Sequence, residues 1–243
     1  MILGQRNAEW AGQGPALEED IALTNMSLDL IGQARMLYQH AAELEGKTED
    51  YYAYFRDAHE FRNFTLCELP HSEAVVGYGR AERDYAFTVV RNFLFSSYMV
   101  LLWTELGEAS DAQLAAIAAK SLKEARYHLR HSRDWLLRLG DGTAESHARM
   151  QAAVNYLLPF TCEWFENKQV KNAVLSIHSH FSAIQFKATF EAQLKASFAE
   201  ATLALPAQTH QNARGAEGVH SEHLSFLLAE MQSVARAHPG ATW

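Results

Sequence analysis

Two five-residue stretches of this chain have the residue types and the spacing of a helical metal site. Residues 29–33 read Asp-Leu-Ile-Gly-Gln, and residues 124–128 read Glu-Ala-Arg-Tyr-His. Helical di-iron bundles draw one Glu from each of two helices and a Glu-x-x-His pair from each of the other two, all directed inward. Here Leu30 and Ala125 stand where those pairs would have their carboxylates. The pattern is typical of a di-iron site that has lost its liganding acids.

Helix geometry places both altered pairs on the inward faces of two predicted helices. At about 100° per residue, Leu30 lies at the centre of an apolar stripe and Gln33 lies about 60° to one side. Ala125 and His128 have the same relation on the later helix, because they are also three residues apart. Both pairs therefore keep the position of a Glu-x-x-His motif without its carboxylate.

The helix expected to supply a further carboxylate lacks one as well. It has no Asp or Glu between Asp84 and Glu105, and it offers Ser96 at the level of the site. Iron held by His128 alone would lack the several ligands that such sites use. We therefore predict that this chain binds no metal and that the following five residues occupy vestigial metal-site positions: Leu30, Gln33, Ser96, Ala125 and His128.

Three alternatives to a vestigial site remain open. Leu30 and Ala125 are ordinary core residues on many helices. An independent di-metal enzyme with an unusual ligand set would draw on Asp29, Glu60, Glu105, Glu124 and His128. A helical module of unrelated binding function would carry the two stretches by coincidence.

Other groups of residues give weaker signals. Residues 220–223 read His-Ser-Glu-His, but two histidines at a helix start more often cap the helix or contact a neighbour than bind a metal. His178 and His180 stand two apart, which points them to different sides of a helix. Residues 77–79, Gly-Tyr-Gly, lack the preceding strand of a dinucleotide-binding loop and are expected to form a turn.

The composition is that of a soluble globular protein, with 48% hydrophobic and 21% charged residues in a chain of 243. A net charge of −8 argues against a nucleic-acid surface, which needs a basic patch. No uninterrupted apolar run reaches the roughly 20 residues of a membrane span, and residues 1–6 do not begin a signal peptide. Cys67 and Cys162 have no paired spacing, which fits a reducing compartment. We expect a cytoplasmic protein without disulfides.

Apolar residues recur at helical spacing along most of the chain, and no segment shows sustained strand alternation. The sequence therefore predicts an all-α chain that forms a single domain over residues 1–243. The predicted helices cover residues 1–12, 15–44, 49–68, 80–107, 111–140, 143–166, 185–204 and 219–237. Gly46 and Gly140 are the expected ends of two of them, Pro159 is an expected bend, and residues 207–218 are expected to form an exposed loop.

Residues 93–103 are apolar on nearly every side of their predicted helix. Such a helix is buried on several sides. Either the core of this chain or an interface with another chain would provide that cover.

Longer motifs, in order along nearly the whole chain, are similar to those of one known family. They are residues 4–10 (GQRNAEW), 17–25 (LEEDIALTN), 29–35 (DLIGQAR), 41–44 (AAEL), 120–129 (KSLKEARYHL), 200–203 (EATL), 220–224 (HSEHL) and 228–232 (LAEMQ). Together they resemble the structural subunit of the bacterial phenylacetyl-CoA epoxidase, a multicomponent monooxygenase.

The resemblance implies a ferritin-like helical bundle with additional C-terminal helices. It also implies a related catalytic subunit that carries the di-iron site and binds the acyl-CoA. In that subunit the two pentads read Asp-Glu-x-x-His and Glu-Glu-x-x-His, so Leu30 and Ala125 replace the second acid of each, and Ser96 corresponds to a further acid. The expected function is a non-catalytic scaffold in aerobic phenylacetate catabolism. The rival is an independent di-metal oxygenase or ferritin-like protein with an atypical ligand set.

The expected partner is the catalytic di-iron epoxidase subunit, in a complex that converts phenylacetyl-CoA to its ring epoxide with dioxygen and a separate reductase. This chain would meet phenylacetyl-CoA only at the interface between the subunits, with self-association left open and no nucleic-acid or membrane partner. Two departures stand out. Family members begin two or three helical turns before Met1, and residues 168–185 diverge from the expected acidic or proline-containing stretch.

Overall fold

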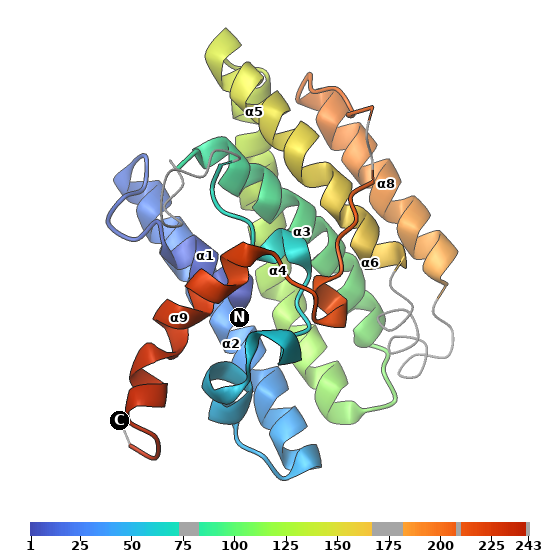
Figure 1. The fold of residues 1–243 in the computed structure, drawn as a ribbon. Helices are drawn as coiled ribbons and strands as arrows, with labels where there is room; N and C mark the ends of the chain where they lie inside the picture. The colour runs from blue at the N-terminus through green and yellow to red at the C-terminus, as the bar shows by residue number, and fades with distance from the viewer. Residues whose placement is uncertain (73–82, 167–181, 208–209, 242–243) are drawn as a thin grey trace. The chain divides into compact units, whose positions relative to one another are not determined.

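The computed structural model describes residues 1–72, 83–166, 182–207 and 210–241 (Figure 1). These residues form helices and turns, with one isolated bridge between Arg214 and Val219 and no strand among them. The all-α prediction is confirmed. The chain divides into two compact units, here called unit 1 (residues 1–70 and 214–243) and unit 2 (residues 71–213), which are described separately. The single domain over residues 1–243 stays a prediction.

In unit 1, α2 (Leu17–Glu45) is the longest element. Three acidic residues occupy its first turn, where the helix dipole favours them. It ends at Gly46, which adopts the left-handed conformation with φ of 66°, as predicted. Leu23, Met26 and Leu30 are buried along its apolar face, whereas Leu44 in the last turn is 74% exposed.

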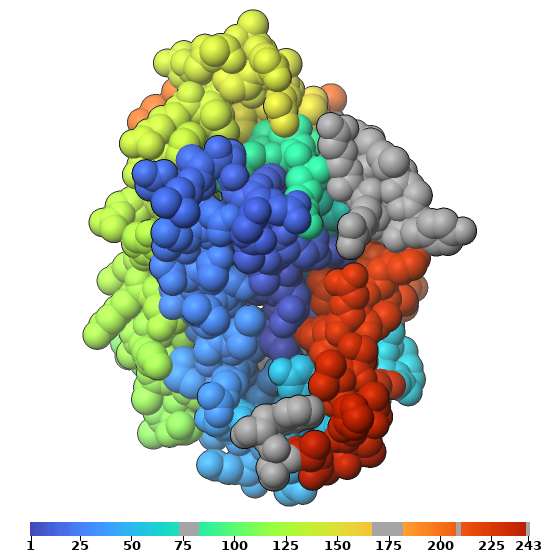
Figure 2. Space-filling view, turned by 90° about the vertical axis from the view of Figure 1, so that its left-hand side faces the viewer, coloured from blue at the N-terminus to red at the C-terminus, as the bar shows by residue number. Residues whose placement is uncertain are grey.

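The short helix α1 (Ile2–Ala8) lies along α2 (Figures 1 and 2). A Cβ atom on Gly4 would lie 3.1 Å from Cγ1 of Ile31 and 3.2 Å from the carbonyl oxygen of Ser27. The Ser27 hydroxyl donates a hydrogen bond to the carbonyl oxygen of Gly4. The missing side chain at Gly4 thus lets the two helices approach closely enough for this bond.

Residues 49–68 do not form the predicted α-helix. They form a π-helical turn η1 (Tyr51–Phe55) and the 3₁₀ turns η2 (Ala58–Glu60) and η3 (Thr65–Cys67). Polar side chains bond the local backbone instead: the Glu60 carboxylate accepts the Asp57 N–H at 2.7 Å, and the Arg56 Nε donates to the carbonyl of Tyr52 at 2.7 Å. Such bonds compete with the helical ladder.

The C-terminal helix α9 (Glu222–Ala237) satisfies carbonyl groups that this irregular segment leaves outside a helix. Gln232 Nε2 donates to the carbonyl of Arg56 at 3.0 Å, and Arg236 Nε donates to that of Tyr54 at 3.0 Å. Before α9 comes the 3₁₀ turn η5 (Gly215–Glu217). Gly215 is buried, and its N–H donates to Thr65 Oγ1, so the predicted exposed loop over residues 207–218 is wrong at this turn.

Unit 2 is a helical bundle in which α3 (Tyr85–Leu106), α4 (Ala112–Gly140), α5 (Ala144–Leu157) and α8 (Ala183–Glu200) pack together. Helix α3 contacts the other three (Figure 1). Among the residues described, α3 is the one helix long and apolar enough to cross a membrane, and 72% of that apolar window is buried in the structure. Within residues 93–103, six residues are buried and the others are half-buried, so the predicted burial on several sides is confirmed for part of the segment: Phe93, Leu94, Ser96, Ser97, Tyr98 and Trp103 are buried. Cover of the rest by another chain stays open. This bundle is consistent with the ferritin-like arrangement that the resemblance implies.

Helix α4 begins and ends as predicted. The Asp111 side chain accepts the N–H of Leu114 at 3.0 Å. At the other end, a Cβ on Gly140 would lie 2.5 Å from the carbonyl oxygen of Ala201, so only glycine allows this approach to the chain that follows α8. The Thr202 hydroxyl donates to the Gly140 carbonyl at 3.1 Å and fastens the contact.

The predicted helix over residues 143–166 is present with its bend. Helix α5 passes into the 3₁₀ turn η4 (Leu158–Cys162), which contains Pro159, and then into α6 (Glu163–Glu166). Tyr98 of α3 packs against aromatic rings of α6 and α8, with the ring centroid of Trp164 at 4.8 Å and that of Phe186 at 5.4 Å. Helix α8 ends at Glu200, four residues before the predicted end.

Candidate functional site

Three of the five vestigial metal-site positions lie in the core of unit 2. Ser96 is on α3, and Ala125 and His128 are on α4, the helix that packs most extensively against α3. All three side chains are buried, and His128 is only 2% exposed. This burial is what an inward position on the two helices requires, and a vestigial metal site at these residues stays a prediction.

Hydroxyl groups, not carboxylates, supply polar atoms on the buried faces of α3 and α4. Ser97 Oγ donates to the carbonyl of Phe93 at 2.7 Å, and Ser132 Oγ donates to that of His128 at 2.7 Å. These bonds return to the helix backbone one turn earlier, a common arrangement for buried serine. Both helices are described over their full length, and no Asp or Glu is buried on either.

The buried charge of α3 is a cation. The Arg91 side chain is fully buried, and its Nη2 donates to Nδ1 of His71 at 2.9 Å. Because a guanidinium can only donate, Nδ1 of His71 carries no proton and also accepts from the Thr88 hydroxyl at 2.7 Å. A second positive charge in this core, such as a metal ion, would meet no buried anion on α3 or α4.

The other two vestigial positions, Leu30 and Gln33, lie on α2 in unit 1. Both are buried, as predicted. Asp29 is half-buried at the edge of the same face. The structure thus places two positions in the core of one unit and three in the core of the other.

Among the alternative ligands, Glu60 already has a structural role. Its carboxylate closes the capping box of η2 with Asp57 and contacts the Tyr51 hydroxyl at 3.4 Å. Glu105 and Glu124 are half-buried on α3 and α4. None of these acids points to a di-metal site within the described residues of either unit.

His220 and Ser221 are half-buried and form a polar cluster with the buried Glu68, and this cluster leaves no nitrogen of His220 for a metal. The Glu68 carboxylate is 0% exposed and contacts Nδ1 of His220 at 2.5 Å. It also accepts from the backbone N–H of Ser221 at 2.9 Å, from the Ser221 hydroxyl at 2.8 Å and from Nδ2 of Asn63 at 2.8 Å. The other nitrogen, Nε2, donates to the carbonyl of Phe61 at 3.0 Å. The prediction that these histidines contact neighbours is confirmed for His220.

Arg6 joins α1 to the same cluster. Its Nε and Nη2 donate to the backbone carbonyl of Glu68 at 2.9 and 2.7 Å, and its Nη1 pairs with Glu9 at 2.6 Å. Burial, followed by the charge of Arg6, lowers the pKa of His223 next to the cluster. Sequence reasoning did not find Glu68, because its partners lie up to 153 positions away.

Several sequence predictions fall outside the described residues. They concern the turn at residues 77–79, the pair His178 and His180, and most of the divergent stretch 168–185. The two cysteines are free thiols, with Cys67 buried and Cys162 half-buried, as expected for a chain without disulfides.

Comparisons with known proteins agree with the resemblance found in the motifs. The family model described as "Phenylacetic acid catabolic protein" matches residues 1–243. One of the subunits of the 1,2-phenylacetyl-CoA epoxidase of Escherichia coli strain K12 is 42% identical over 244 residues, an alignment that covers 100% of this chain and 94% of that protein. The predicted family is confirmed: this chain belongs to the phenylacetic acid catabolic proteins.

Proposed function

We propose that this chain is a non-catalytic subunit of a phenylacetyl-CoA epoxidase complex and that it supports a separate di-iron subunit. The proposal rests first on its similarity to a protein named as one of the subunits of that enzyme. The observation that carries its non-catalytic part is the lack of buried acids on α3 and α4, where Ser96 and Ala125 occupy positions at which a di-iron helix would bring carboxylates.

The donor set explains why iron should not bind. A di-iron site in a helical bundle uses four carboxylates and two histidines. At the predicted positions the nitrogen donor on α4 is the imidazole of His128, and on α2 it is the amide of Gln33. The buried carboxylate of α2, that of Glu19, lies eleven residues before Leu30, about 16 Å along the helix. A divalent iron ion gives up water ligands when it binds to a protein, and one neutral nitrogen donor does not replace them. We therefore infer that this chain holds no di-iron centre.

The role that remains is mechanical and geometric. A folded helical partner would stabilise the catalytic subunit, help shape the acyl-CoA cleft at their interface and fix the geometry of the assembly. The oxidation of phenylacetyl-CoA to its ring epoxide, with dioxygen and electrons from a reductase, would occur on the catalytic subunit. This chain would touch phenylacetyl-CoA only where the two subunits meet.

The test is co-expression with the catalytic subunit, followed by purification and iron analysis of the complex and of each chain alone. We expect the two chains to co-elute, with iron near stoichiometric in the complex and at trace level in this chain alone. A matched variant, His128→Gln, should leave the iron content of the complex unchanged, since His128 is proposed to bind none.

Two results would overturn the proposal at different points. Near-stoichiometric iron in the isolated chain, lost in His128→Gln, would support the independent di-metal enzyme. Failure of the chains to co-elute, together with full activity of the catalytic subunit alone, would exclude the supporting role.

A further inference from the structure

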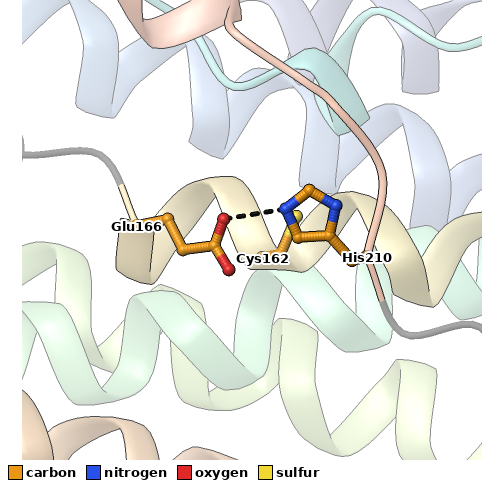
Figure 3. A group of neighbouring side chains, drawn as sticks. All are labelled: Cys162, Glu166 and His210. Carbon is orange, nitrogen blue, oxygen red and sulfur yellow. Dashed lines mark hydrogen bonds and ion pairs between the residues drawn. The ribbon is translucent and has the colours of Figure 1, made fainter.

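A second group of metal-ligating side chains lies in unit 2, away from the vestigial positions. Cys162, Glu166 and His210 each offer one ligand atom, and these three atoms lie within 4.8 Å of one another (Figure 3). Nε2 of His210 is 3.0 Å from Oε2 of Glu166. Figure 3 shows the imidazole directed at the carboxylate, with the sulfur beside the ring.

Local geometry brings the three together. Cys162 ends η4 and Glu166 ends α6, so they stand four residues apart on continuous helical turns, a spacing that puts two side chains on one face. The Cys162 thiol donates to the backbone carbonyl of Gln211 at 3.1 Å. That bond holds the segment after His210 against the helical turns and keeps the imidazole over the same face.

We propose that Cys162, Glu166 and His210 form a three-ligand site for Zn²⁺, with a water molecule in the fourth position. Thiolate, imidazole and carboxylate are the donors that zinc uses in proteins, and a tetrahedral ion with bonds of about 2.0 to 2.3 Å needs its donor atoms roughly 3.3 to 3.8 Å apart. The Glu166–His210 distance is already close to this, and the sulfur needs only a small side-chain movement. Mixed soft and hard donors of this kind do not suit Mg²⁺ or Ca²⁺.

The surroundings of the site favour a cation and allow it to enter. The side chains of Glu166 and His210 are 55% and 61% exposed, which gives the ion a path from solvent. The carboxylates of Glu166 and Glu163 add negative charge near the sulfur. Zinc binds the thiolate, so binding releases the thiol proton and the metal bond replaces the hydrogen bond to Gln211; affinity should therefore increase with pH.

A bound ion would link two segments that are far apart in the sequence. His210 and Glu166 are 44 positions apart in the chain, and the ion would join α6 to the segment that leads out of unit 2. This inference does not depend on the proposed function, because none of the three donors belongs to the five vestigial positions. One chain can have both this zinc site and a core without iron.

Cobalt substitution of the full chain tests the proposal directly. Co²⁺ added to the protein under reducing conditions should give a thiolate-to-cobalt charge-transfer band in the near ultraviolet, and the band should vanish in Cys162→Ser. In competition with a chromophoric chelator, His210→Ala and Glu166→Gln should bind Zn²⁺ at least about tenfold more weakly, since even outer-shell changes cost that much. Cys67→Ser, which alters the other thiol, and His238→Ala, an exposed histidine on unit 1, should bind Zn²⁺ as the unaltered chain does.

The proposal is overturned if cobalt gives no charge-transfer band, or if the band survives in Cys162→Ser. It is also overturned if His210→Ala and Glu166→Gln bind Zn²⁺ as tightly as the unaltered chain. Far-ultraviolet circular dichroism shows whether each variant is folded. Because Glu166 and His210 are exposed, their variants remain informative even if a cysteine variant loses structure.

Discussion

Replacing Glu68 by Gln should destabilise unit 1 strongly, because this carboxylate is the centre of its buried polar cluster. The side chain is 0% exposed and receives hydrogen bonds from Asn63, from Ser221 and from His220. Nδ1 of His220 faces this carboxylate, and Nε2 faces the Phe61 carbonyl. Gln keeps the shape of Glu but removes the negative charge and turns one acceptor into a donor.

The magnitude follows from what is left behind. Gln replaces one carboxylate oxygen, which has two hydrogen-bond contacts, by an amide group that can only donate. Hydrogen bonds to a charged group are worth roughly 1.5 to 3 kcal/mol each, so the loss of two costs about 3 to 5 kcal/mol. For a chain of this size, each kcal/mol lowers the thermal midpoint by about 2 to 4 °C, which predicts a fall of roughly 6 to 20 °C.

Urea unfolding of the full chain at neutral pH, followed by far-ultraviolet circular dichroism, measures the effect. Glu217→Gln is the matched control, since Glu217 pairs with Arg214 at 2.8 Å on the surface of the same unit and should contribute less than about 1 kcal/mol. The Glu68→Gln/His220→Gln double variant should lose less stability than the sum of the single variants, because the two side chains contact each other and each single change disrupts the same contact. If Glu68→Gln changes the free energy of unfolding no more than Glu217→Gln does, the Glu68 carboxylate is not the centre of this cluster.

Three further predictions concern other parts of the chain. Gly140→Ala should lower the free energy of unfolding by about 1 to 3 kcal/mol, because its Cβ would lie 2.5 Å from the Ala201 carbonyl oxygen. Gly32→Ala is the matched control: no atom lies within 4 Å of its new Cβ, so it should stabilise α2 by about 0.5 to 1 kcal/mol. Burial lowers the pKa of His223 below its ordinary value of 6.5, so the unfolded chain binds more protons than the folded one near and below that pH. The free energy of unfolding should therefore fall as pH falls below 6.5, and His223→Gln should weaken this pH dependence in urea titrations at several pH values. An unchanged pH dependence in the variant would contradict the prediction. Ala125→Glu should cost about 3 kcal/mol or more, measured by the same unfolding assay, because it buries a carboxylate; a variant as stable as the parent would show that the site is wetter than its burial indicates.

The long helices could be predicted because local signals and tertiary packing agree there. The acidic first turn and Gly46 define α2, and Asp111 and Gly140 define α4. The bend at Pro159 follows from the missing N–H of proline, which local sequence also reveals. In each case the residues that decide the structure are neighbours in the chain.

Residues 49–68 show the opposite case. Their aromatic residues recur at a spacing that fits a helix, but the side chain of Arg56 and the carboxylate of Glu60 bond the local backbone and interrupt the ladder. A readable signal was present, because Asp57 followed three residues later by Glu60 is a capping-box pattern that marks a new helical start. The backbone carbonyl of Arg56 accepts a hydrogen bond from Gln232 of α9, and local sequence could not reveal a partner so far along the chain.

The positions of the vestigial site could be predicted for the same reason as the helices, since rotation about one axis fixes which face each residue occupies. Leu30 and His128 are buried as that rotation requires. The polar cluster at Glu68 and the contact between Glu166 and His210 could not, because each joins residues separated by dozens of positions. Helical period carries no information about such pairings.

Apolar residues at the predicted vestigial positions Leu30 and Ala125 affect the stability of the core and, on the proposed function, its ability to bind a metal. A buried carboxylate costs free energy unless a cation neutralises it, so a di-iron core without iron is a strained one. Leu30 and Ala125 remove that cost, because apolar side chains stabilise the core by their own burial. We therefore expect a chain of this kind to reach its folded state without iron. On the proposed function this matters directly, since a supporting subunit that folds without metal can hold its partner in shape before and after that partner receives its iron.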